Sequence, residues 1–400
     1  MNMNISFENI SEDIASRMRE IRYYLHRNPE PSWNERETTR IIRQILSELE
    51  GIEFIETGLS TGVLAVLHGN EPGPTVALRA DIDALHVEET WAGPCRSERE
   101  GLGHLCGHDF HTAALLGAAM MLAEVRNGLH GNVLFIFQPA EETTDGARAL
   151  IAHGLYEKCP FQAVFGLHNR PEVPTGHVVV KRGALMAAKI NFKIVVHGVG
   201  GHGSMPHRCV DPVVCAAAIV QTVLTIPSRN VDPMEAMVAS ICSIHGGTPD
   251  NLIVDRVEMT GAMRYLDEQT GERGLQRLKT IVESVAETYE CTSEFEITER
   301  VRPVLNDERL YPLAMDVAER IFGQDAVESS SGCLATEDFS EYMQLAPGWF
   351  YWLGNRKPDE GISPWHNSNF HVDDDALPYG ARLLATSAWA FLDSDRQSSH

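Results

Sequence analysis

Apolar residues in the first part of the chain follow two spacings, which predict helices alternating with buried strands. Amphipathic stretches at 10–25 and 38–49 indicate helices, and Gly51 follows the second one, where a helix C-terminus favours glycine. Short apolar runs indicate strands at 63–67, 76–78, 133–137 and 163–167. Further helices are predicted at 110–125 and 147–152. This alternation favours an α/β fold with a largely parallel sheet.

The pattern changes after residue 187, where a second kind of unit is indicated. Residues 189–196 alternate between polar and apolar, as a half-exposed strand does. The elements that follow are a helix at 213–224, strands at 237–244 and 257–265, a helix at 274–288 and a strand at 293–298. This β-α-β-β-α-β order is typical of a ferredoxin-like unit with an antiparallel sheet. The first pattern resumes after residue 310, so we predict a domain at 187–298 inserted into a larger domain made of 1–186 and 299–400.

Composition narrows the class of protein. A chain of 400 residues is too long for one ordinary hydrophobic core, which agrees with two domains. The net charge of −23 argues against nucleic acid or an anionic membrane as a partner. Glu12 and Asp13 stand where a secretory signal would be basic and apolar, and the longest apolar run, 113–123, is shorter than the roughly 20 residues that span a bilayer. Eight widely spaced cysteines indicate reduced thiols and a cytoplasmic protein.

The stretch Cys106-Gly107-His108-Asp109, with His111 soon after it, carries the first sign of chemistry. A thiolate and an imidazole two residues apart suit one metal centre. Such a pair cannot complete four-coordination around zinc by itself. Further ligands must therefore come from elsewhere in the chain.

Other donors follow predicted strands. Glu141 and Glu142 come after the strand at 133–137, and although such a pair is often an exposed loop, the core character of that strand places both carboxylates at the carboxyl edge of the sheet. One of them can bind metal while the other faces a metal-bound water as general base. His168 ends the strand at 163–167; a lone histidine there is more often structural, but the company of the other donors favours a ligand.

Late in the chain His366 and His371 are both candidates for a further ligand, and spacing does not choose between them.

One cysteine, three histidines and one or two carboxylates are too many donors for one four-coordinate ion. The count fits a two-metal site, in which one ligand or water bridges the ions. Mixed sulfur, nitrogen and oxygen donors favour zinc, and manganese, cobalt or nickel remain possible.

These segments together resemble the M20 metallopeptidase family, in its aminoacylase and hippurate-hydrolase-like amidohydrolase branch. The resemblance extends in order over essentially the whole chain. The motifs that carry it are Arg79-Ala80-Asp81-Ile82-Asp83-Ala84-Leu85, Cys106-Gly107-His108-Asp109, Phe137-Gln138-Pro139-Ala140-Glu141-Glu142, Gly166-Leu167-His168, Gly200-Gly201-His202-Gly203-Ser204, Pro206-His207, Gly246-Gly247-Thr248-Pro249-Asp250-Asn251 and His366.

The resemblance implies a larger α/β/α catalytic domain with a central mixed sheet, and an inserted lid and dimerisation domain that makes a homodimer. It also implies roles for single residues. Glu141 matches the general base, and Asp83 matches an aspartate that orients the site from behind the ligands. The residues that match metal ligands, with Cys106 in the bridging position, are Cys106, His108, Glu142, His168 and His366.

Three residues of the inserted domain match substrate-handling positions. The glycines around His202 lack the ending of a P-loop and the dinucleotide-binding spacing, and they could also build only a tight turn. The resemblance implies instead that His202 reaches the other subunit's site and stabilises the oxyanion. Arg264 ends an apolar strand and could meet an internal carboxylate, whereas the resemblance implies that Arg264 and Asn251 hold the α-carboxylate of the substrate.

The sequence therefore predicts a dimetal amidohydrolase that acts on N-acyl L-amino acids. A dipeptidase or carboxypeptidase on the same site is the nearest alternative, and a catalytically silent metal-binding homologue is another. The chain departs from the usual sequence of the family at four places, which are His86, the segment 91–104, Ala335-Thr336 and Trp365-His366-Asn367. These departures concern the pocket walls, so they affect the preference for the acyl group.

Overall fold

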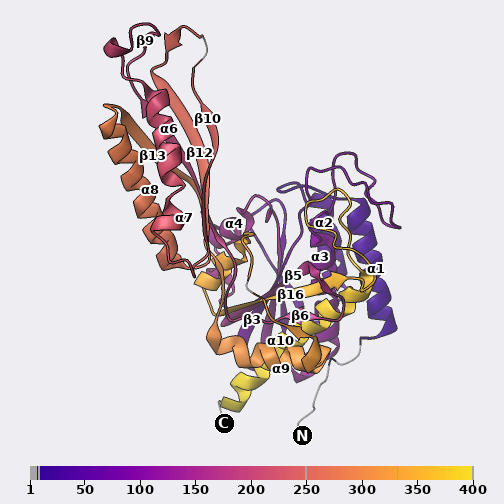
Figure 1. Ribbon diagram of the computed structural model, residues 1–400. Helices are drawn as coiled ribbons and strands as arrows, with labels where there is room; N and C mark the ends of the chain where they lie inside the picture. Colours follow the sequence, from indigo (N-terminus) through magenta and orange to yellow (C-terminus); the bar gives the residue numbers. More distant parts are fainter. Residues whose placement is uncertain (1–6, 8–9, 248–249, 331, 399–400) are drawn as a thin grey trace. The chain divides into compact units, whose positions relative to one another are not determined.

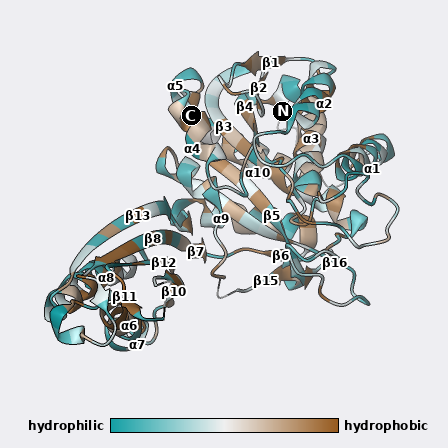
Figure 2. Cartoon of the chain, turned by 90° about the horizontal axis from the view of Figure 1, so that it is seen from above, coloured by the Kyte–Doolittle hydropathy of each residue, from teal (hydrophilic) through white to brown (hydrophobic). Residues whose placement is uncertain are grey.

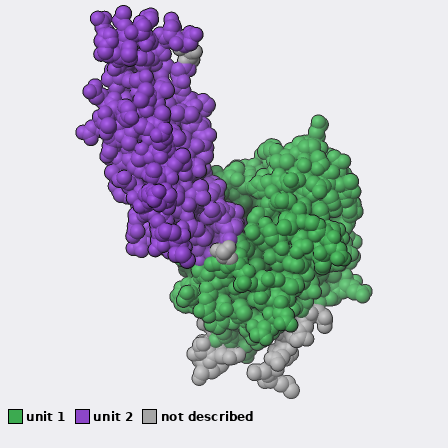
Figure 3. Space-filling model, viewed as in Figure 1, with its two compact units in different colours: residues 1–183, 305–331, 338–400 green, residues 184–304, 332–337 purple. Residues whose placement is uncertain are grey.

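The computed structural model describes residues 7, 10–247, 250–330 and 332–398. Its internal contacts divide the chain into two compact units, which Figure 3 colours separately. Unit 1 consists of Met1–Gly183, Leu305–Ser331 and Asp338–His400, and unit 2 of Ala184–Val304 and Gly332–Glu337. No helix among the described residues is long and apolar enough to cross a membrane.

Eight strands of the described residues form the sheet of unit 1 (Figure 1), in the order β1-β2-β4-β3-β5-β16-β6-β15. Their bounds are Ile52–Ile55 (β1), Val63–His68 (β2), His130–Gln138 (β4), Glu71–Asp81 (β3), Ala163–Pro174 (β5), Gly348–Arg356 (β16), Val178–Val179 (β6) and Val327–Glu328 (β15). The inner strands β4, β3, β5 and β16 run parallel, whereas β1–β2, β2–β4 and β16–β6 pair antiparallel. The outer pair β6–β15 is parallel as well. The α/β class and the mixed sheet are confirmed, and the expectation of a largely parallel sheet holds for the inner strands and for this outer pair.

Helices cover this sheet. The central helix α3 (His108–Glu124) is apolar nearly all round and buried from its first residue to Leu122, as such a helix must be. It packs against α1 (Glu12–Arg27) and α10 (Leu377–Ser398). The other helices of this unit are α2 (Arg36–Ser47), α4 (Gly146–Ala152), α5 (Leu155–Lys158) and α9 (Tyr311–Phe322). Hydrophobic residues, brown in Figure 2, fill the strands and the inward faces of these helices.

Unit 2 has the predicted β-α-β-β-α-β order. Its sheet follows the order β10-β12-β8-β13, and all three pairings are antiparallel. The bounds are Ala188–His197 (β8), Pro212–Val223 (α6), Met237–His245 (β10), Arg256–Tyr265 (β12), Glu268–Thr288 (α8) and Thr292–Val301 (β13). A short helix α7 (Ile226–Arg229) and a ribbon of β9 (Gly201–His202) with β11 (Leu252–Ile253) complete it. The strands β7 (Gly183–Met186) and β14 (Val304–Asn306) lie where the chain passes between the units.

The parallel strands bring several polar residues to one edge of the large sheet. Strand β3 ends at Asp81, which lies opposite Gln138 at the end of β4. His168 lies on the neighbouring strand β5. The prediction that His168 ends its strand is wrong, because β5 continues to Pro174 as a partner of β16.

Candidate metal centre

The five predicted metal ligands gather at the carboxyl edge of the sheet. Three overlapping groups each bring one ligand atom per residue within 4.8 Å of the others. These groups are Cys106–His108–His168, Cys106–Glu142–His366 and His108–Glu141–Glu142. Cys106 and His108 each belong to two groups, so the groups form one continuous cluster of sulfur, nitrogen and oxygen donors.

Distances within the cluster show how the donors face one another. The Sγ of Cys106 lies 3.4 Å from Nε2 of His168. The two carboxylate oxygens of Glu142 face different histidines: Oε1 lies 3.8 Å from Nε2 of His108, and Oε2 lies 3.5 Å from Nε2 of His366. Glu142 therefore lies between two imidazoles.

Local backbone conformations present these donors. Gly107 has φ 89°, which lets the chain turn between Cys106 and the first residue of α3. Ala140, just before the glutamate pair, and His366 also have left-handed conformations, with φ 54° and 62°. Non-glycine residues seldom adopt this region, so backbone strain is concentrated in two of the segments that carry the donors.

Asp83 lies behind two of the donors. Its Oδ1 is 3.1 Å from Nδ1 of His108, and its Oδ2 accepts hydrogen bonds from the backbone N–H of Glu142 (3.0 Å) and the hydroxyl of Ser32 (2.7 Å). Because an ionised carboxylate only accepts, Nδ1 of His108 donates to Asp83, which leaves Nε2 as the ring nitrogen that faces the cluster.

A divalent ion fits this arrangement. Among the described residues, the buried Nε2 of His108 and the buried Oε1 of Glu142 have no hydrogen-bond partner. Buried polar atoms without a partner are costly, and a metal ion held by Oε1 and by Nε2 after its deprotonation would satisfy both atoms. Glu141 is buried and places Oε2 4.0 Å from the same Nε2 of His108, next to the position of such an ion.

Burial dominates the electrostatics of the cluster. Burial, followed by the charges of Glu142 and Glu141, raises the pKa of the Cys106 thiol well above its usual value. Burial also raises the pKa of Glu142 to about 7. Burial lowers the pKa of His168 well below its usual value, whereas Asp81 and Asp83 overcome burial at His108 and raise its pKa to about 10. Metal binding must therefore release protons, above all from Cys106 and His108.

Asp81 and His111 form a fourth potential group with His108, but their polar atoms are already paired. The Oδ1 of Asp81 accepts from Nδ1 of His111 (2.6 Å), and Oδ2 accepts from Arg79 (2.8 Å). The Nε2 of His111 accepts from the backbone N–H of Asn169 (2.9 Å). Through these hydrogen bonds Asp81 and His111 connect β3, α3 and β5 beside the cluster. No pattern in the sequence indicates this role.

Of the two late histidines, His366 is the one in the cluster. His371 instead lies 3.1 Å from a carboxylate oxygen of Glu360 and stacks on Trp91, with ring centroids 5.3 Å apart.

The three predicted residues of unit 2 lie at its two ends. His202 is on β9 opposite Leu252, and the carbonyl of Asn251 accepts from the N–H of Gly203 (2.9 Å), so His202 and Asn251 share one ribbon. Arg264 is near the other end of β12. At the 3.3 Å rise of a strand it lies ~26 Å from Arg256, the first residue of β12 after the ribbon. Its guanidinium donates to the carbonyl of Leu334 (3.1 Å) and to the Thr336 hydroxyl. Thr248 and Pro249, which precede Asn251 in the family-like motif, lie outside the described residues.

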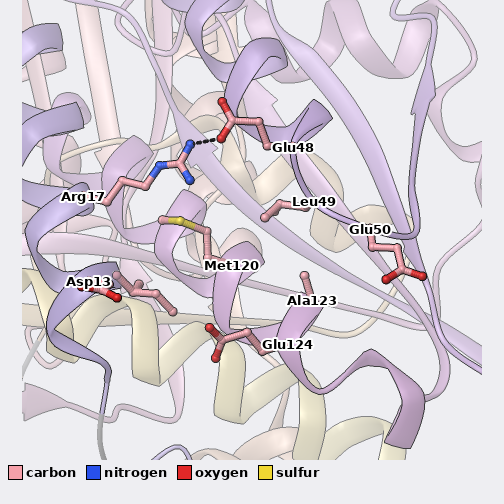
Figure 4. A pocket seen from close by; sticks show the side chains of 9 residues that line it. Asp13, Arg17, Glu48, Leu49, Glu50, Met120, Ala123 and Glu124 are labelled. Carbon is pink, nitrogen blue, oxygen red and sulfur yellow. Dashed lines mark hydrogen bonds and ion pairs between the residues drawn. The ribbon is translucent and has the colours of Figure 1, made fainter.

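A separate hollow of about 330 Å³ lies among α1, the residues that follow α2 and the C-terminal end of α3 (Figure 4). Arg17 and Glu48 form an ion pair on its wall, and Met120 contributes to its lining. Met120 is twelve residues beyond His108 on α3, which is ~18 Å at the rise of a helix. The hollow contains none of the predicted site residues and is not part of the metal centre.

Comparisons with known proteins agree with this geometry. The model of the family described as Peptidase family M20/M25/M40 matches residues 77–390. Thermostable carboxypeptidase 2 of Saccharolobus solfataricus is 39% identical over 396 residues, 98% of this chain and 99% of that protein. N-acetylcysteine deacetylase of Bacillus subtilis is 38% identical over 381 residues, 95% and 98% of the two chains. Among solved structures, a dinuclear metal-binding peptidase of the M20 family from Bacillus subtilis has a TM-score of 0.84 at 35% identity, covering 96% of this chain and 99% of that one.

Proposed function

Since the chain belongs to peptidase family M20/M25/M40, we propose that it is a dimetal amidohydrolase that cleaves N-acyl L-amino acids into a carboxylic acid and a free amino acid. The observation that carries the proposal is the continuous donor cluster beside the buried carboxylate of Glu141. Its relative in Bacillus subtilis, by its name, removes an acetyl group from an amino acid.

The metal would be held by Cys106, His108, Glu142, His168 and His366. Two bound divalent ions, zinc foremost and manganese, cobalt or nickel as alternatives, supply polarisation of the amide carbonyl and a more acidic water. The protein's own residues do the rest of the chemistry.

Glu141 takes a proton from the attacking water and delivers it to the leaving nitrogen. Asp83 holds His108 and the backbone of Glu142 in position. His202 donates a hydrogen bond to the developing oxyanion, and Asn251 and Arg264 bind the α-carboxylate of the substrate.

The separation of these residues along unit 2 supports a site built from two chains. Arg264 lies ~26 Å along β12 from Arg256, and the ribbon that carries Asn251 lies beyond Arg256, so the two side chains are too far apart to hold one carboxylate in the same chain. Two subunits can meet this requirement, if Arg264 comes from one and the ribbon with His202 and Asn251 from its partner.

The surface of unit 2 supports a homodimer. Helix α6 exposes Val213 and Val214, Leu224 is exposed directly after it, and β10 is an edge strand that exposes Val238 and Ile244. An unpaired strand edge beside exposed apolar side chains favours pairing with a second copy. We therefore assign residues 187–298 as the lid and dimerisation domain, and 1–186 with 299–400 as the catalytic domain.

A second candidate is a carboxypeptidase or dipeptidase, favoured by the name of the relative at 39% identity. A third candidate is a catalytically silent metal-binding homologue. The intact pair Glu141-Glu142 argues against it, because a protein that only binds metal needs no general base. The test is hydrolysis by the metal-loaded enzyme of acetyl-, benzoyl- and indole-acyl amino acids, alongside dipeptides and N-blocked peptides.

We expect acyl amino acids to be cleaved best, and Glu141→Gln to lower kcat by roughly 10²–10⁴-fold with metal content unchanged. A clear preference for peptides would favour the second candidate. A metal-loaded wild type that is inert on every substrate would favour the silent homologue.

A further inference from the structure

Asn169 carries an arrangement that neither the resemblance nor the mechanism uses. It follows His168 on β5, and its side chain is fully buried. Its amide nitrogen donates to the carbonyl of Cys106 (2.6 Å) and to Nε2 of His111 (3.0 Å). Its amide oxygen accepts from the indole N–H of Trp365 (3.1 Å) and from the amide of Asn355 (3.1 Å). All four hydrogen-bonding positions of the amide are therefore occupied.

Three of these four partners lie in segments that carry metal ligands. Cys106 is a ligand itself, and Trp365 directly precedes His366. His111 lies on α3, one turn after His108. Asn169 is bonded along the chain to His168. One amide thus connects the backbone segments of four of the five predicted ligands.

Gly107 packs directly against the same amide. A Cβ atom on Gly107 would lie 2.4 Å from Nδ2 of Asn169, closer than any real contact. The Asn169 amide therefore packs directly on the turn between Cys106 and His108. This contact, together with φ 89°, explains why glycine stands at this position.

Trp365 is held from a second side. The guanidinium of Arg170 lies 4.8 Å from the Trp365 ring centroid and 4.3 Å from that of Trp352. The backbone N–H of His366 donates to the carbonyl of Leu105 (2.8 Å), next to Cys106. The position of His366, whose own φ is 62°, is thus fixed by its neighbours rather than by backbone preference.

The orientation of the Asn169 amide follows from its partners. Turned by 180°, its oxygen would face the carbonyl oxygen of Cys106, and its nitrogen would face the donors of Trp365 and Asn355. The hydrogen bonds with Cys106, Trp365 and Asn355 would then be lost. Aspartate has the same shape but offers only oxygens, so it cannot satisfy the Cys106 carbonyl.

We propose that Asn169 is a positioning residue, whose amide holds the segments of Cys106, His108, His168 and His366 in the geometry that binds metal. The inference rests on the metal centre of the proposed function and not on the identity of its substrate. An outer partner that orients ligands typically contributes ten- to hundred-fold in metal affinity.

The test is the zinc dissociation constant of Asn169→Asp, measured by competition with a chromophoric chelator, together with unfolding temperatures of the metal-free and zinc-loaded protein. The matched control is Asn306→Asp. Asn306 is a buried asparagine of the same unit, which donates to the carbonyls of Lys181 and Phe350 (2.9 Å each) and accepts from the N–H of Phe350 (2.7 Å).

We expect Asn169→Asp to bind zinc ten- to hundred-fold more weakly, and its zinc-induced rise in unfolding temperature to shrink. Asn306→Asp should lower both unfolding temperatures together and leave the affinity within about three-fold of wild type. If both variants lower stability and neither changes zinc affinity, Asn169 is only structural and the proposal fails.

A second pair decides the case if Asn169→Asp does not fold. Trp365→Phe keeps an aromatic ring beside Arg170 but removes the N–H that Asn169 accepts. In Trp349→Phe no described hydrogen bond is lost, because the buried Nε1 of Trp349 has no partner among the described residues. Zinc should bind several-fold more weakly to the first variant only, and equal affinities would overturn the proposal. Because no readout depends on turnover, an inert wild type would defeat the proposed activity without touching this result.

Discussion

Cys106 offers one sulfur to two groups of donors, one with His108 and His168 and the other with Glu142 and His366. A single atom that faces both groups is the arrangement that a bridging ligand requires. Burial and the neighbouring glutamates hold its pKa high, so the free protein carries a thiol there. A thiol must lose its proton before it can bind metal.

Cys106→Ala should therefore lower bound metal and activity together. In the wild type, zinc affinity should rise with pH, because the protons on Cys106 and His108 compete with the ion. The slope should be smaller in Cys106→Ala, in which one of these protons is missing. Metal analysis and zinc titrations at several pH values measure both effects, with Cys159→Ala, a buried cysteine outside the cluster, as the control. Full metal occupancy and normal turnover in Cys106→Ala would rule out its role as a ligand.

The donor residues could be predicted from the sequence, whereas the hydrogen bonds between them could not. Cys106, His108 and the glutamate pair belong to short motifs, so their chemistry is visible one segment at a time. The partners of Asn169 come from two parts of the chain, 106–111 and 355–365, which are both far from it in the sequence. An asparagine after a histidine carries no signal of its own. Only the folded backbone brings these segments together.

At the scale of elements, the N-terminus of α3 depends on a glycine for two separable reasons. Gly107 has a left-handed conformation, and it lies against the amide of Asn169. Gly154, which precedes α5, has the same left-handed conformation (φ 84°, ψ 31°), but the nearest atoms to the position of a Cβ there lie 3.7 and 3.8 Å away, at ordinary contact distance. It therefore shows the cost of the conformation without that of a steric clash.

Gly154→Ala should lower the free energy of unfolding by about 1–2 kcal/mol, the usual cost of a left-handed conformation. Gly107→Ala should cost more, because its methyl group also displaces the Asn169 amide, and it should weaken zinc binding as well. Denaturant unfolding and zinc titration of both variants check this. Equal stability losses with unchanged zinc affinity would show that the contact with Asn169 has no energetic effect.

A buried ionic network connects α1, the start of α3 and the loop before it. Nδ1 of His26 lies 2.9 Å from Asp109, and its Nε2 lies 3.1 Å from Glu89. Arg22 donates to the same oxygen of Asp109 (3.1 Å). Burial opposes the charge on His26, but Asp109 and Glu89 overcome it and raise the pKa of His26 to about 9.

The network predicts a loss of stability on the alkaline side. A histidine whose folded pKa is raised stabilises the fold fully below its unfolded pKa of roughly 6.5. That contribution decreases between pH 6.5 and 9 and is lost as the pH rises through the folded value. The free energy of unfolding should fall over this range in the wild type and less steeply in His26→Gln, in which His108 still loses its proton as the pH rises. Parallel curves for the two proteins would show that His26 is not charged in the folded state.

Element type was easier to predict than strand direction. Continuous apolar runs marked β2, β4 and β5, because buried strands need such residues on both faces. The apolar pattern does not indicate the antiparallel edges, because β1 and β6 are short and periodicity says nothing about strand direction; the mixed sheet follows only from the resemblance. The extension of β5 past His168 was also missed, because Pro171 and Pro174 are typical of a loop.

At the scale of the whole molecule, the residues expected to handle substrate lie too far apart within unit 2 for one chain to bring them all to one site. Arg264 lies at one end of β12, and the ribbon that carries His202 and Asn251 lies beyond the other. In a symmetric dimer, a residue that reaches into its partner's site does so in both directions. Each site would then use Glu141 of one chain and His202 of the other.

Mixing two inactive variants tests this directly. Glu141→Gln and His202→Ala chains, unfolded and refolded together, should form mixed dimers in which one of the two sites has both residues intact. With random pairing, half of the dimers are mixed, so about a quarter of wild-type activity should return. If His202 served its own chain, every site would lack one residue and no activity would return. Tags on the two variants verify that mixed dimers form, and mixing Glu141→Gln with a chain that carries both substitutions provides the blank. Background activity in a verified mixture would exclude the two-chain site.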